Sequence, residues 1–566
     1  MRSGGKALQR EGSRHDPGQG IPASFTEGSS AWLSCGTSPP PLPAVNVALV
    51  YPRMPDTFWS MHHALKVFGK QAFYPPLGLL TIAALLPEAW EKRLVDTNVR
   101  PLSADDLAWA DLVFLSAMNV QEPSARALIA QAKAAGVPVV AGGPLFTHEW
   151  ELFPDVDHFV LNEAELTLPD FLADLERGTP QRLYSAPHRF ADVTASPVPL
   201  WELADVDAYQ YAIVQYTRGC PYECDFCDVT ALFGRKPRVK EPAQIIAELD
   251  RLLEVSDTEF VLFADDNLIG NKKKLMRELL PALIAWRREK QPSVYFGTQV
   301  TINLADDDEL MRLMLEAGFR HLFVGIETPS EDGLKACKKR QNTKRDMLEN
   351  IERLHRAGFI VVAGFIVGFD TDTPDIFRRQ IDFIQESGIV LSTVNLLKAP
   401  PGTELHERMK AEGRLLERFS FDEARTNFVP AMDADVLYDG FDQLIEQVYA
   451  PEQVYRRVRT FLDTYRLPKT ETRIPAPNPL RYVGIALRSI TMVGLSPRVG
   501  RYYWRLLAWA LRNDRRLIDH AIQNAIMIYQ LDALYRSYRE ARRDGGQIGG
   551  STHFVHATGR ADAVAA

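Results

Sequence analysis

Short apolar runs alternate with amphipathic stretches over the first third of the chain. The apolar runs, typical of buried strands, cover residues 45–51, 93–98, 112–117, 137–141 and 158–161. Stretches with a helical composition lie between or after them, at residues 77–86, 124–135 and 163–176. Strands that alternate with helices form βαβ units and a parallel sheet. The pattern therefore predicts an α/β, Rossmann-like domain over residues 45–180.

The same alternation begins again after a proline-bearing stretch, residues 181–206, which we interpret as a linker. Strands are expected at residues 211–216, 260–264, 294–300, 321–325, 360–369 and 391–397. Helices are expected at residues 241–254, 272–289, 306–317, 346–357 and 376–387. Six strand–helix units in series fit an open, partial (β/α)6 barrel over residues 207–415.

The remaining parts of the chain lack strands. Residues 416–545 are predicted to be mostly helical. Residues 1–44 are rich in Gly, Ser and Pro and lack the apolar core of a signal peptide, so we interpret them as a disordered tail. Residues 546–566 are interpreted as a second disordered tail. No apolar run reaches the roughly 20 residues that a membrane-spanning helix needs.

Composition is that of an ordinary globular protein, but the charge is unevenly distributed. The net charge of −8 argues against a general nucleic-acid binder. Residues 467–545 carry 14 Lys and Arg against 6 Asp and Glu, which leaves the rest of the chain near −16. This asymmetry indicates an acidic partner surface for the C-terminal region, such as anionic lipid.

A short segment after the strand predicted at residues 211–216 carries the most specific chemical signal. Cys220, Cys224 and Cys227 are separated by three and then two residues. Thiolates suit iron–sulfur clusters and zinc, and a [4Fe–4S] cube normally takes four of them. Three ligands would leave one iron open to a substrate or cosubstrate.

Two other interpretations of these cysteines remain. A zinc site needs a fourth ligand, and no His or Cys lies nearby in the sequence to supply it. A disulfide would leave one thiol over, and five Cys in 566 residues without a secretory signal argue for a reducing compartment. Cys35, in the predicted N-terminal tail, has no expected role.

The carboxyl ends of the first domain's strands are the expected ligand edge, because parallel sheets bind ligands there. Candidate contacts at this edge follow three different strands: Asn98, Gly142, Gly143, Pro144, Asn162 and Glu163. The glycines would allow a bulky ligand to approach the backbone closely. The alternative is a degenerate Rossmann domain that only supports the next domain.

The ordered motifs together resemble the cobalamin-dependent (B12-binding) radical S-adenosylmethionine (SAM) family. The matching features are the Cys-x-x-x-Cys-x-Phe-Cys loop, Asp265-Asp266-Asn267 and Gly-Ile-Glu-Thr-Pro around Glu327. Within that family they resemble the hopanoid C-2 methylase and its relatives, which share a helical C-terminal extension. The Asp-x-His-x-x-Gly cobalamin motif is absent, and Asn98 stands where a His is wanted. The resemblance therefore implies cobalamin without an axial protein histidine.

The resemblance also assigns roles to individual residues. Cys220, Cys224 and Cys227 would hold a [4Fe–4S] cluster, and Phe226 would pack on the adenine of SAM. Asp265, Asp266 and Asn267 would bind the methionine amino group, with ordinary strand-end capping as the alternative. The remaining expected SAM contacts lie on two later barrel strands: Glu327, Gly364, Ile366 and Gly368.

Two features fall outside the family motifs. Cys337 lies next to Lys338 and Lys339, which would lower its pKa and favour a catalytic thiol; an ordinary helix cysteine is the alternative. Arginines at positions 498, 501, 505, 512 and 516 recur at helical spacing, with Trp504 on another face. A basic, Trp-bearing helix of this kind lies in membrane interfaces, although it also fits a helix packed on the barrel.

The expected activity is C-methylation. By resemblance, cobalamin would carry the methyl group, and a 5′-deoxyadenosyl radical would activate an unactivated carbon of a hopanoid, isoprenoid or other secondary-metabolite substrate. The alternatives are a cobalamin-assisted radical cyclase or oxidoreductase, and a non-catalytic iron–sulfur and cobalamin sensor. The expected partners are a small-molecule or lipid substrate and an electron donor such as flavodoxin or ferredoxin, with no nucleic acid. We expect a cytoplasmic protein with peripheral contact at the inner membrane face.

Overall fold

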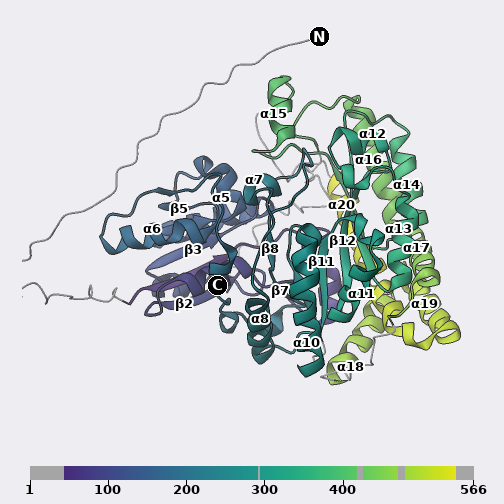
Figure 1. Ribbon diagram of the computed structural model, residues 1–566, viewed down its shortest axis with the longest axis horizontal. Helices are drawn as coiled ribbons and strands as arrows, with labels where there is room; N and C mark the ends of the chain where they lie inside the picture. Colours follow the sequence, from purple (N-terminus) through teal and green to yellow (C-terminus); the bar gives the residue numbers. More distant parts are fainter. Residues whose placement is uncertain (1–43, 291–293, 417–424, 469–478, 544–566) are drawn as a thin grey trace, which may run out of the picture. The chain divides into compact units, whose positions relative to one another are not determined.

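The first domain is a six-stranded parallel sheet with helices on its faces (Figure 1). In spatial order the strands are β2 (Glu91–Asp96), β1 (Asn46–Tyr51), β3 (Leu112–Ser116), β4 (Val139–Gly142), β5 (His158–Val160) and β6 (Leu183–Tyr184). The associated helices are α1 (His62–Phe68), α2 (Leu77–Leu85), α3 (Ala104–Trp109), α4 (Glu122–Ala134), α5 (Pro144–Glu149) and α6 (Ala164–Glu176). The Rossmann-like architecture predicted from the apolar runs is confirmed.

The computed structural model describes residues 44–290, 294–416, 425–468 and 479–543, and these belong to one compact unit, Pro43–Ala566. The predicted tails lie outside the described residues, except for Ala44 at the end of the first. One expectation needs correction: the linker at 181–206 contributes β6, which pairs with β5 through Phe159 and Leu183. Two residues give no periodic pattern, so the sequence does not mark this edge strand.

The second domain is the expected open barrel of six parallel strands. Their order is β7 (Ala212–Val214), β10 (Phe260–Phe263), β11 (Tyr295–Val300), β12 (Phe319–Glu327), β13 (Ile360–Val367) and β14 (Ser392–Leu396). The helices that follow the strands include α8 (Pro242–Val255), α10 (Leu280–Lys290), α11 (Asp308–Ala317), α13 (Met347–Ala357) and α14 (Ile376–Ser387). Two of these helices begin at an aspartate that caps them. The carboxylate of Asp307 accepts a backbone N–H in the first turn of α11, and that of Asp346 does the same in α13.

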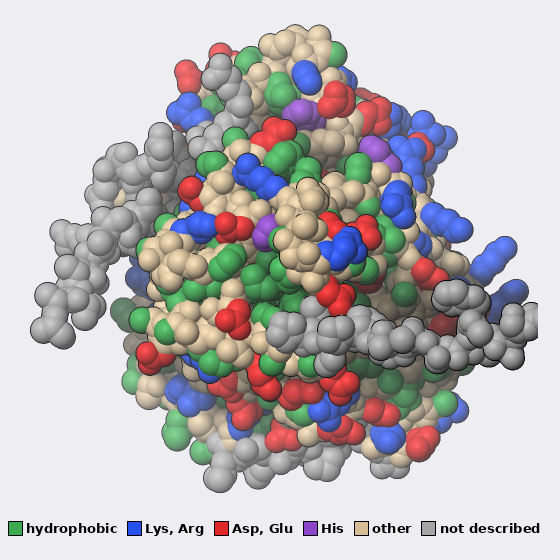
Figure 2. Space-filling model, turned by 90° about the vertical axis from the view of Figure 1, so that its left-hand side faces the viewer, with side chains coloured by type: hydrophobic (Ala, Val, Ile, Leu, Met, Phe, Trp, Pro, Cys, Tyr) green, Lys and Arg blue, Asp and Glu red, His purple; other side chains and the backbone are tan. Residues whose placement is uncertain are grey.

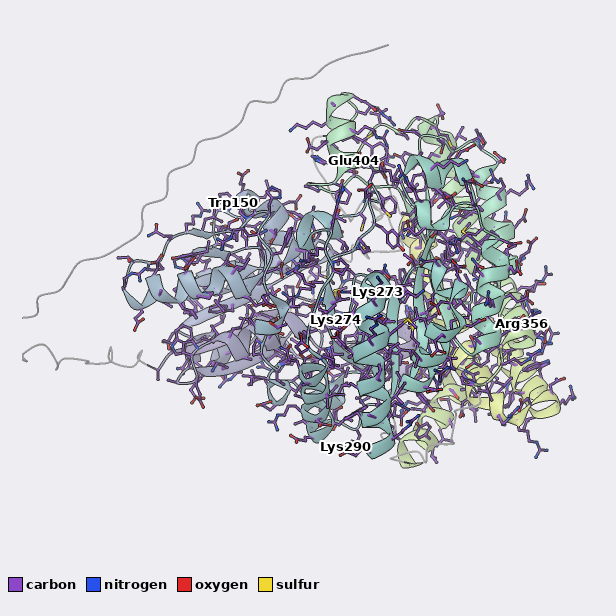
Figure 3. All side chains as sticks on the ribbon, viewed as in Figure 1. Trp150, Lys273, Lys274, Lys290, Arg356 and Glu404 are labelled. Carbon is purple, nitrogen blue, oxygen red and sulfur yellow. The ribbon has the colours of Figure 1, made fainter. Side chains whose placement is uncertain are left out.

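A small subdomain joins β7 to α8 and carries the cysteines. It consists of the two-stranded ribbon β8 (Thr217–Arg218) and β9 (Arg238–Val239), with α7 (Val229–Phe233) between them. Two short helices, α12 (Glu331–Ala336) and α15 (Glu404–Ala411), follow β12 and β14. Glu404, labelled in Figure 3, is in the first turn of α15 and pairs with Lys338, just after α12.

The C-terminal region is helical, as predicted, and packs on the barrel. It contains α16 (Ala434–Tyr449), α17 (Pro451–Thr464), α18 (Pro479–Arg488), a π-helical turn η10 (Ser489–Gly494), α19 (Gly500–Asn513) and α20 (Ile518–Arg543). The buried Arg457 of α17 donates to Gln385 of α14 (2.6 Å). Gln530 of α20 accepts from the backbone of Ala64 in α1 (2.8 Å). The region therefore contacts both preceding domains.

Acidic side chains gather on one face of the molecule, with some Lys and Arg among them. Figure 2 shows Asp and Glu side chains gathered in the lower part of the face that it presents. In the part of the chain that the structure describes, no helix is long and apolar enough to cross a membrane.

Candidate active site

The cysteine loop is fixed by hydrogen bonds from several directions. Gly219, in the left-handed region at φ 91°, donates its N–H to Oδ2 of Asp266 (2.7 Å). A Cβ at Gly219 would lie about 3 Å from three carbonyl oxygens, so glycine is required here. The N–H of Asp225 donates to the carbonyl of Cys337 (3.2 Å), and its carbonyl accepts from Leu405 (2.8 Å). The loop is thereby tied to α12 and α15.

Three half-buried thiols face a buried positive charge in this loop. Burial raises the pKa of Cys220, Cys224 and Cys227, whereas the ammonium of Lys339 lowers it by a smaller amount. Gln341 donates its side-chain amide to Sγ of Cys224 (3.7 Å). A nearby cation and an N–H donor are what thiolate ligands need once their protons have left.

The arrangement of the thiols fits a cluster and not a single metal ion. No three His, Cys, Asp or Glu side chains among the described residues are spaced to hold one ion. In a [4Fe–4S] cube each thiolate ligates a different iron, so the sulfur atoms need not converge on one point. The donor set, three thiols without a fourth ligand among the described residues, therefore fits a [4Fe–4S] cluster.

The acidic pair after β10 holds the loop. Oδ1 of the fully buried Asp265 accepts from the backbone N–H groups of Tyr216 (2.8 Å) and Thr217 (2.7 Å). Burial raises the pKa of Asp265 to about 7 and that of Asp266 to about 6. Asn267 is buried too, but neither side-chain atom of its amide has a partner within the described residues. Within this motif, Asn267 thus has both amide atoms free for a ligand, and Asp265 has one free carboxylate oxygen, Oδ2.

The other expected SAM contacts either pack in a buried apolar cluster or lie in, or directly after, β12 and β13. Phe226 and Ile366 pack against the same buried cluster, which contains Cys337 and Phe369. Glu327 has a left-handed backbone (φ 67°) beside a register shift in β12, and its carboxylate pairs with Lys339 (2.5 Å). Gly364 pairs with Gly325 in β12, and Gly368 donates its N–H to Asp372 (2.8 Å).

The expected lowering of the Cys337 pKa is wrong. The side chain is 1% exposed, and burial raises its pKa to about 12. Its Sγ lies 3.6 Å from the carbonyl oxygen of Leu334, one turn earlier. Lys338 and Lys339 point their charges to Glu404 and Glu327, so neither stabilises a thiolate at Cys337. A protonated thiol here packs as an apolar side chain.

Most of the polar groups expected to contact cobalamin are engaged within the protein. The side-chain amide N–H of Asn98 donates to the carboxylate of Asp96 (2.7 Å). The side-chain oxygen of Asn98 accepts from the backbone N–H of Met54 (2.7 Å). Asn162, at φ 65°, accepts from Ser185 and Ala186. Gly143 closes tightly on β3, because a Cβ there would lie 2.7 Å from Oγ of Ser116. Gly142 and Pro144 flank it at the start of α5.

Glu163 connects the two domains. Its carboxylate pairs with Arg218 of β8 (2.9 Å) and Arg238 of β9 (2.8 Å). These two strands belong to the small subdomain that carries the cysteines. Glu165 also pairs with Arg218 (2.8 Å). These four side chains are at most 14% exposed, so the ion pairs are buried. Glu163 thus links the first domain to the cysteine loop.

Sequence reasoning missed His148. It lies in α5, four residues after Pro144, and both ring nitrogens are buried without a hydrogen-bond partner in the described structure. Burial lowers its pKa, and Asp228, next to Cys227, raises it by less. In the sequence, only its closeness to Gly142, Gly143 and Pro144, where a ligand is expected, points to a role for His148. No motif spacing predicts it as a site residue.

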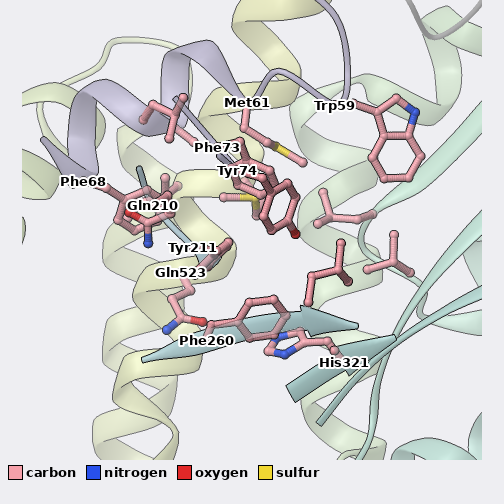
Figure 4. A pocket seen from close by; sticks show the side chains of 18 of the residues that line it. Trp59, Met61, Phe68, Phe73, Tyr74, Gln210, Tyr211, Phe260, His321 and Gln523 are labelled. Atoms are coloured by element: carbon pink, nitrogen blue, oxygen red, sulfur yellow. The ribbon is translucent and has the colours of Figure 1, made fainter. Parts of the chain in front are cut away.

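A cavity of about 2240 Å³ lies where the three regions meet. It reaches the carboxyl ends of β1 and β2 at Tyr51 and Asn98, and it extends along the inner wall of the barrel to Phe260 and His321. Figure 4 shows aromatic side chains around it, including Trp59, Phe73, Tyr74 and Tyr211. Ligand pockets usually measure about 300–1,000 Å³, so this one has room for a large cofactor at the Rossmann edge together with a second ligand.

Fold and site define a cobalamin-dependent radical SAM protein. Family models match in the same order: a B12 binding domain at residues 71–172, the radical SAM superfamily at 214–384 and a domain of unknown function (DUF4070) at 403–544. Its cofactors are a [4Fe–4S] cluster, SAM and cobalamin.

The chain belongs to the family of cobalamin-dependent radical SAM methyltransferases. It is 35% identical to the hopanoid C-2 methylase of Rhodopseudomonas palustris, covering 85% of this chain and 91% of that protein. It is 37% identical to an uncharacterized methyltransferase of Synechocystis sp., covering 84% and 89%. Among solved structures, the TsrM methyltransferase of Kitasatospora setae shares the fold, with a TM-score of 0.55 at 14% identity over 88% of this chain and all of that one.

Proposed function

We propose that this enzyme transfers a methyl group to an unactivated carbon of an apolar polycyclic or isoprenoid lipid. The observation that carries the proposal is the cavity of about 2240 Å³ with aromatic and aliphatic walls. A cavity of this kind suits a large, rigid, apolar substrate better than a small polar metabolite. The similarity to a hopanoid C-2 methylase supports the same substrate class.

When bound, the cofactors supply the methyl group and the one-electron chemistry that removes hydrogen from carbon. We assign Cys220, Cys224 and Cys227 to the cluster. The amide of Asn267 binds the amino acid part of SAM, whereas Asp265 and Asp266 hold the cysteine loop in position. Phe226 and the strand with Gly364, Ile366 and Gly368 form the adenine side of the site.

The walls of the cavity orient the substrate and exclude water. Side chains alternate along each barrel strand, so every second residue points inward. Leu262, Phe323 and Val362 form part of the wall on three strands. Excluding water protects reactive species from side reactions. An external electron donor such as a flavodoxin or ferredoxin delivers the electron, and we place the enzyme in the cytoplasm, at the membrane that contains its substrate.

Product analysis tests the proposal. The anaerobically purified protein is reconstituted with iron, sulfide and cobalamin, then supplied with reductant, SAM and a lipid extract from a strain lacking the gene. We expect one lipid to gain the mass of a CH₂ group and 5′-deoxyadenosine to accumulate. Cys227→Ala is expected to abolish both.

A second outcome distinguishes the cyclase alternative. Weaker relatives include anaerobic magnesium-protoporphyrin IX monomethyl ester cyclases, at 24–27% identity. Consumption of a substrate with no gain of a CH₂ mass would contradict methyl transfer and favour such a reaction. Binding of both cofactors without SAM cleavage would favour a sensor.

A further inference from the structure

Exposed apolar side chains gather on the C-terminal helices. Thirteen large apolar side chains in the described part of the chain are exposed, and six of them lie between Tyr482 and Leu511. The three most exposed of all thirteen are Leu495 (69%), Leu487 (60%) and Val483 (56%). Scattered exposed apolar residues need no explanation, whereas a concentration of them indicates a binding surface.

Four of these side chains form one feature, which we call the apolar ridge: Val483, Leu487, Leu495 and Trp504. Val483 and Leu487 are one turn apart on α18, and η10 continues from there to Leu495. The indole N–H of Trp504 donates to the carbonyl of Gly494 (3.0 Å), which brings the ring beside Leu495. The polar atom of Trp504 is thus satisfied within the protein, and its ring is left for an apolar or interfacial environment.

A basic stripe lies beside the ridge on α19. At about 100° per residue, Arg501, Arg505 and Arg512 fall within about 40° of one another on the solvent side of the helix. Arg505 and Arg512 have no acidic partner among the residues that the structure describes, and both are exposed. The expected five-arginine face is partly wrong: α19 spans Gly500–Asn513, so positions 498 and 516 lie outside it, and Arg498 pairs with Asp532 (2.9 Å).

The helix that carries half of the ridge is also a wall of the cavity. Tyr482, Ile485 and Ala486 of α18 line the cavity, whereas Val483 and Leu487 face outward. Arg488 donates to the carbonyl of Val67 at the end of α1 (2.8 Å). The Tyr482 hydroxyl donates to Glu259, just before β10 (2.5 Å). A single helix, held at both ends, therefore separates the cavity from the outward-facing ridge.

We propose that the apolar ridge and the stripe of Arg501, Arg505 and Arg512 dock the enzyme on an anionic bilayer, and that the lipid substrate enters the cavity beside α18. The stripe complements anionic headgroups, and Trp504 suits the headgroup level. Docking at this surface places the outer side of α18 against lipid while its inner side faces the cavity. The entry route rests on the proposed lipid substrate, but the docking surface does not.

Vesicle flotation of the reconstituted, full-length enzyme tests the surface. Vesicles of phosphatidylglycerol and phosphatidylcholine are compared with vesicles of phosphatidylcholine alone, at low and high salt. We expect flotation with the anionic vesicles that weakens with salt. The variant Leu487→Ser/Leu495→Ser/Trp504→Ser is expected to lower the partition coefficient by about tenfold or more, and Arg505→Glu/Arg512→Glu to remove the preference for anionic vesicles.

The matched control replaces exposed apolar residues elsewhere, Leu152→Ser/Val436→Ser, and is expected to float like the parent protein. Equal flotation of the ridge variant and this control would overturn the proposed surface. Flotation without lipid methylation would support the surface and refute the proposed substrate class. Methylation of lipid in detergent micelles without flotation would overturn the surface and leave the proposed function intact.

Discussion

The ammonium of Lys339 is held between two kinds of negative partner. Burial lowers its pKa, but the carboxylate of Glu327 and the thiolate form of Cys224 raise it by more. The Lys339 and Glu327 side chains are each only 9% exposed. Removal of one partner from a buried ion pair leaves an uncompensated charge. Lys339 is therefore important both for the fold and for the charge of the cysteine loop.

Lys339→Met is expected to lower the free energy of unfolding by about 3–5 kcal/mol and to reduce the iron bound after reconstitution. Denaturant unfolding under anaerobic conditions and iron analysis measure the two effects. The control is Lys338→Met, which breaks a more exposed pair with Glu404 and is expected to cost at most about 1 kcal/mol. Equal effects of the two substitutions would contradict the role given to Lys339.

His355 makes the fold sensitive to mild acid. Its ring packs in α13 against Phe461 (centroids 5.1 Å apart), and burial lowers its pKa to about 4. The unfolded chain protonates near pH 6.5, so the contribution to stability is complete above that pH. It is lost as the pH falls from about 6.5 to 4, by up to about 3 kcal/mol.

The pH dependence has a simple test. Between pH 7 and pH 5 the unfolding free energy of His355→Phe is expected to fall less than that of the parent protein. His321, whose pKa is also lowered to about 4 by burial, remains in the variant, so the dependence is reduced and not abolished. Parallel pH profiles for the two proteins would refute the assignment.

At the scale of elements, Glu163, which follows β5, connects the first domain to β8 and β9 through its ion pairs with Arg218 and Arg238. Glu163→Gln is expected to lower the unfolding free energy by about 3–5 kcal/mol, because the buried Arg238 loses the carboxylate it pairs with and Arg218 keeps only that of Glu165. It is also expected to speed the loss of iron in a chelator, since Arg218 immediately precedes Gly219 and Cys220. Glu223→Gln, in an exposed pair with Arg235 of the same loop, is the control and is expected to behave like the parent protein.

The elements themselves could be read from the sequence because buried parallel strands are continuous apolar runs. Residues 45–51 and 360–369, for example, predict β1 and β13 within two residues. The site could be predicted only where the spacing of reactive residues is specific for one kind of ligand, as for Cys220, Cys224 and Cys227. The backbone contacts of Asp265, the charge on Lys339 and the position of His148 depend on how distant segments pack, and no local pattern encodes them.

At the scale of the whole molecule, the cavity depends on all three regions. Its wall combines Trp59 before α1, Phe323 on β12 and Gln523 on α20, residues that are far apart in the sequence. Charge asymmetry in the sequence indicated a distinct role for the C-terminal region, but only packing shows that this region closes the cavity.

Val362→Trp tests the use of this space. The added ring would occupy the inner wall of β13, so we expect the ratio of methylated lipid to 5′-deoxyadenosine to fall about tenfold or more. Val362→Ile changes the volume much less and serves as the control, with a ratio near that of the parent protein. An unchanged ratio in the Trp variant would place the reacting lipid elsewhere.

The carboxylates of Asp265 and Asp266 have a consequence for how the enzyme matures. They hold the backbone of Tyr216, Thr217 and Gly219 through groups that belong to the protein alone. The segment leading to Cys220 is therefore held by contacts that do not include the cluster. We expect the chain to fold before the cluster is inserted. The folded apoprotein would then present its three thiols to the proteins that deliver iron and sulfide.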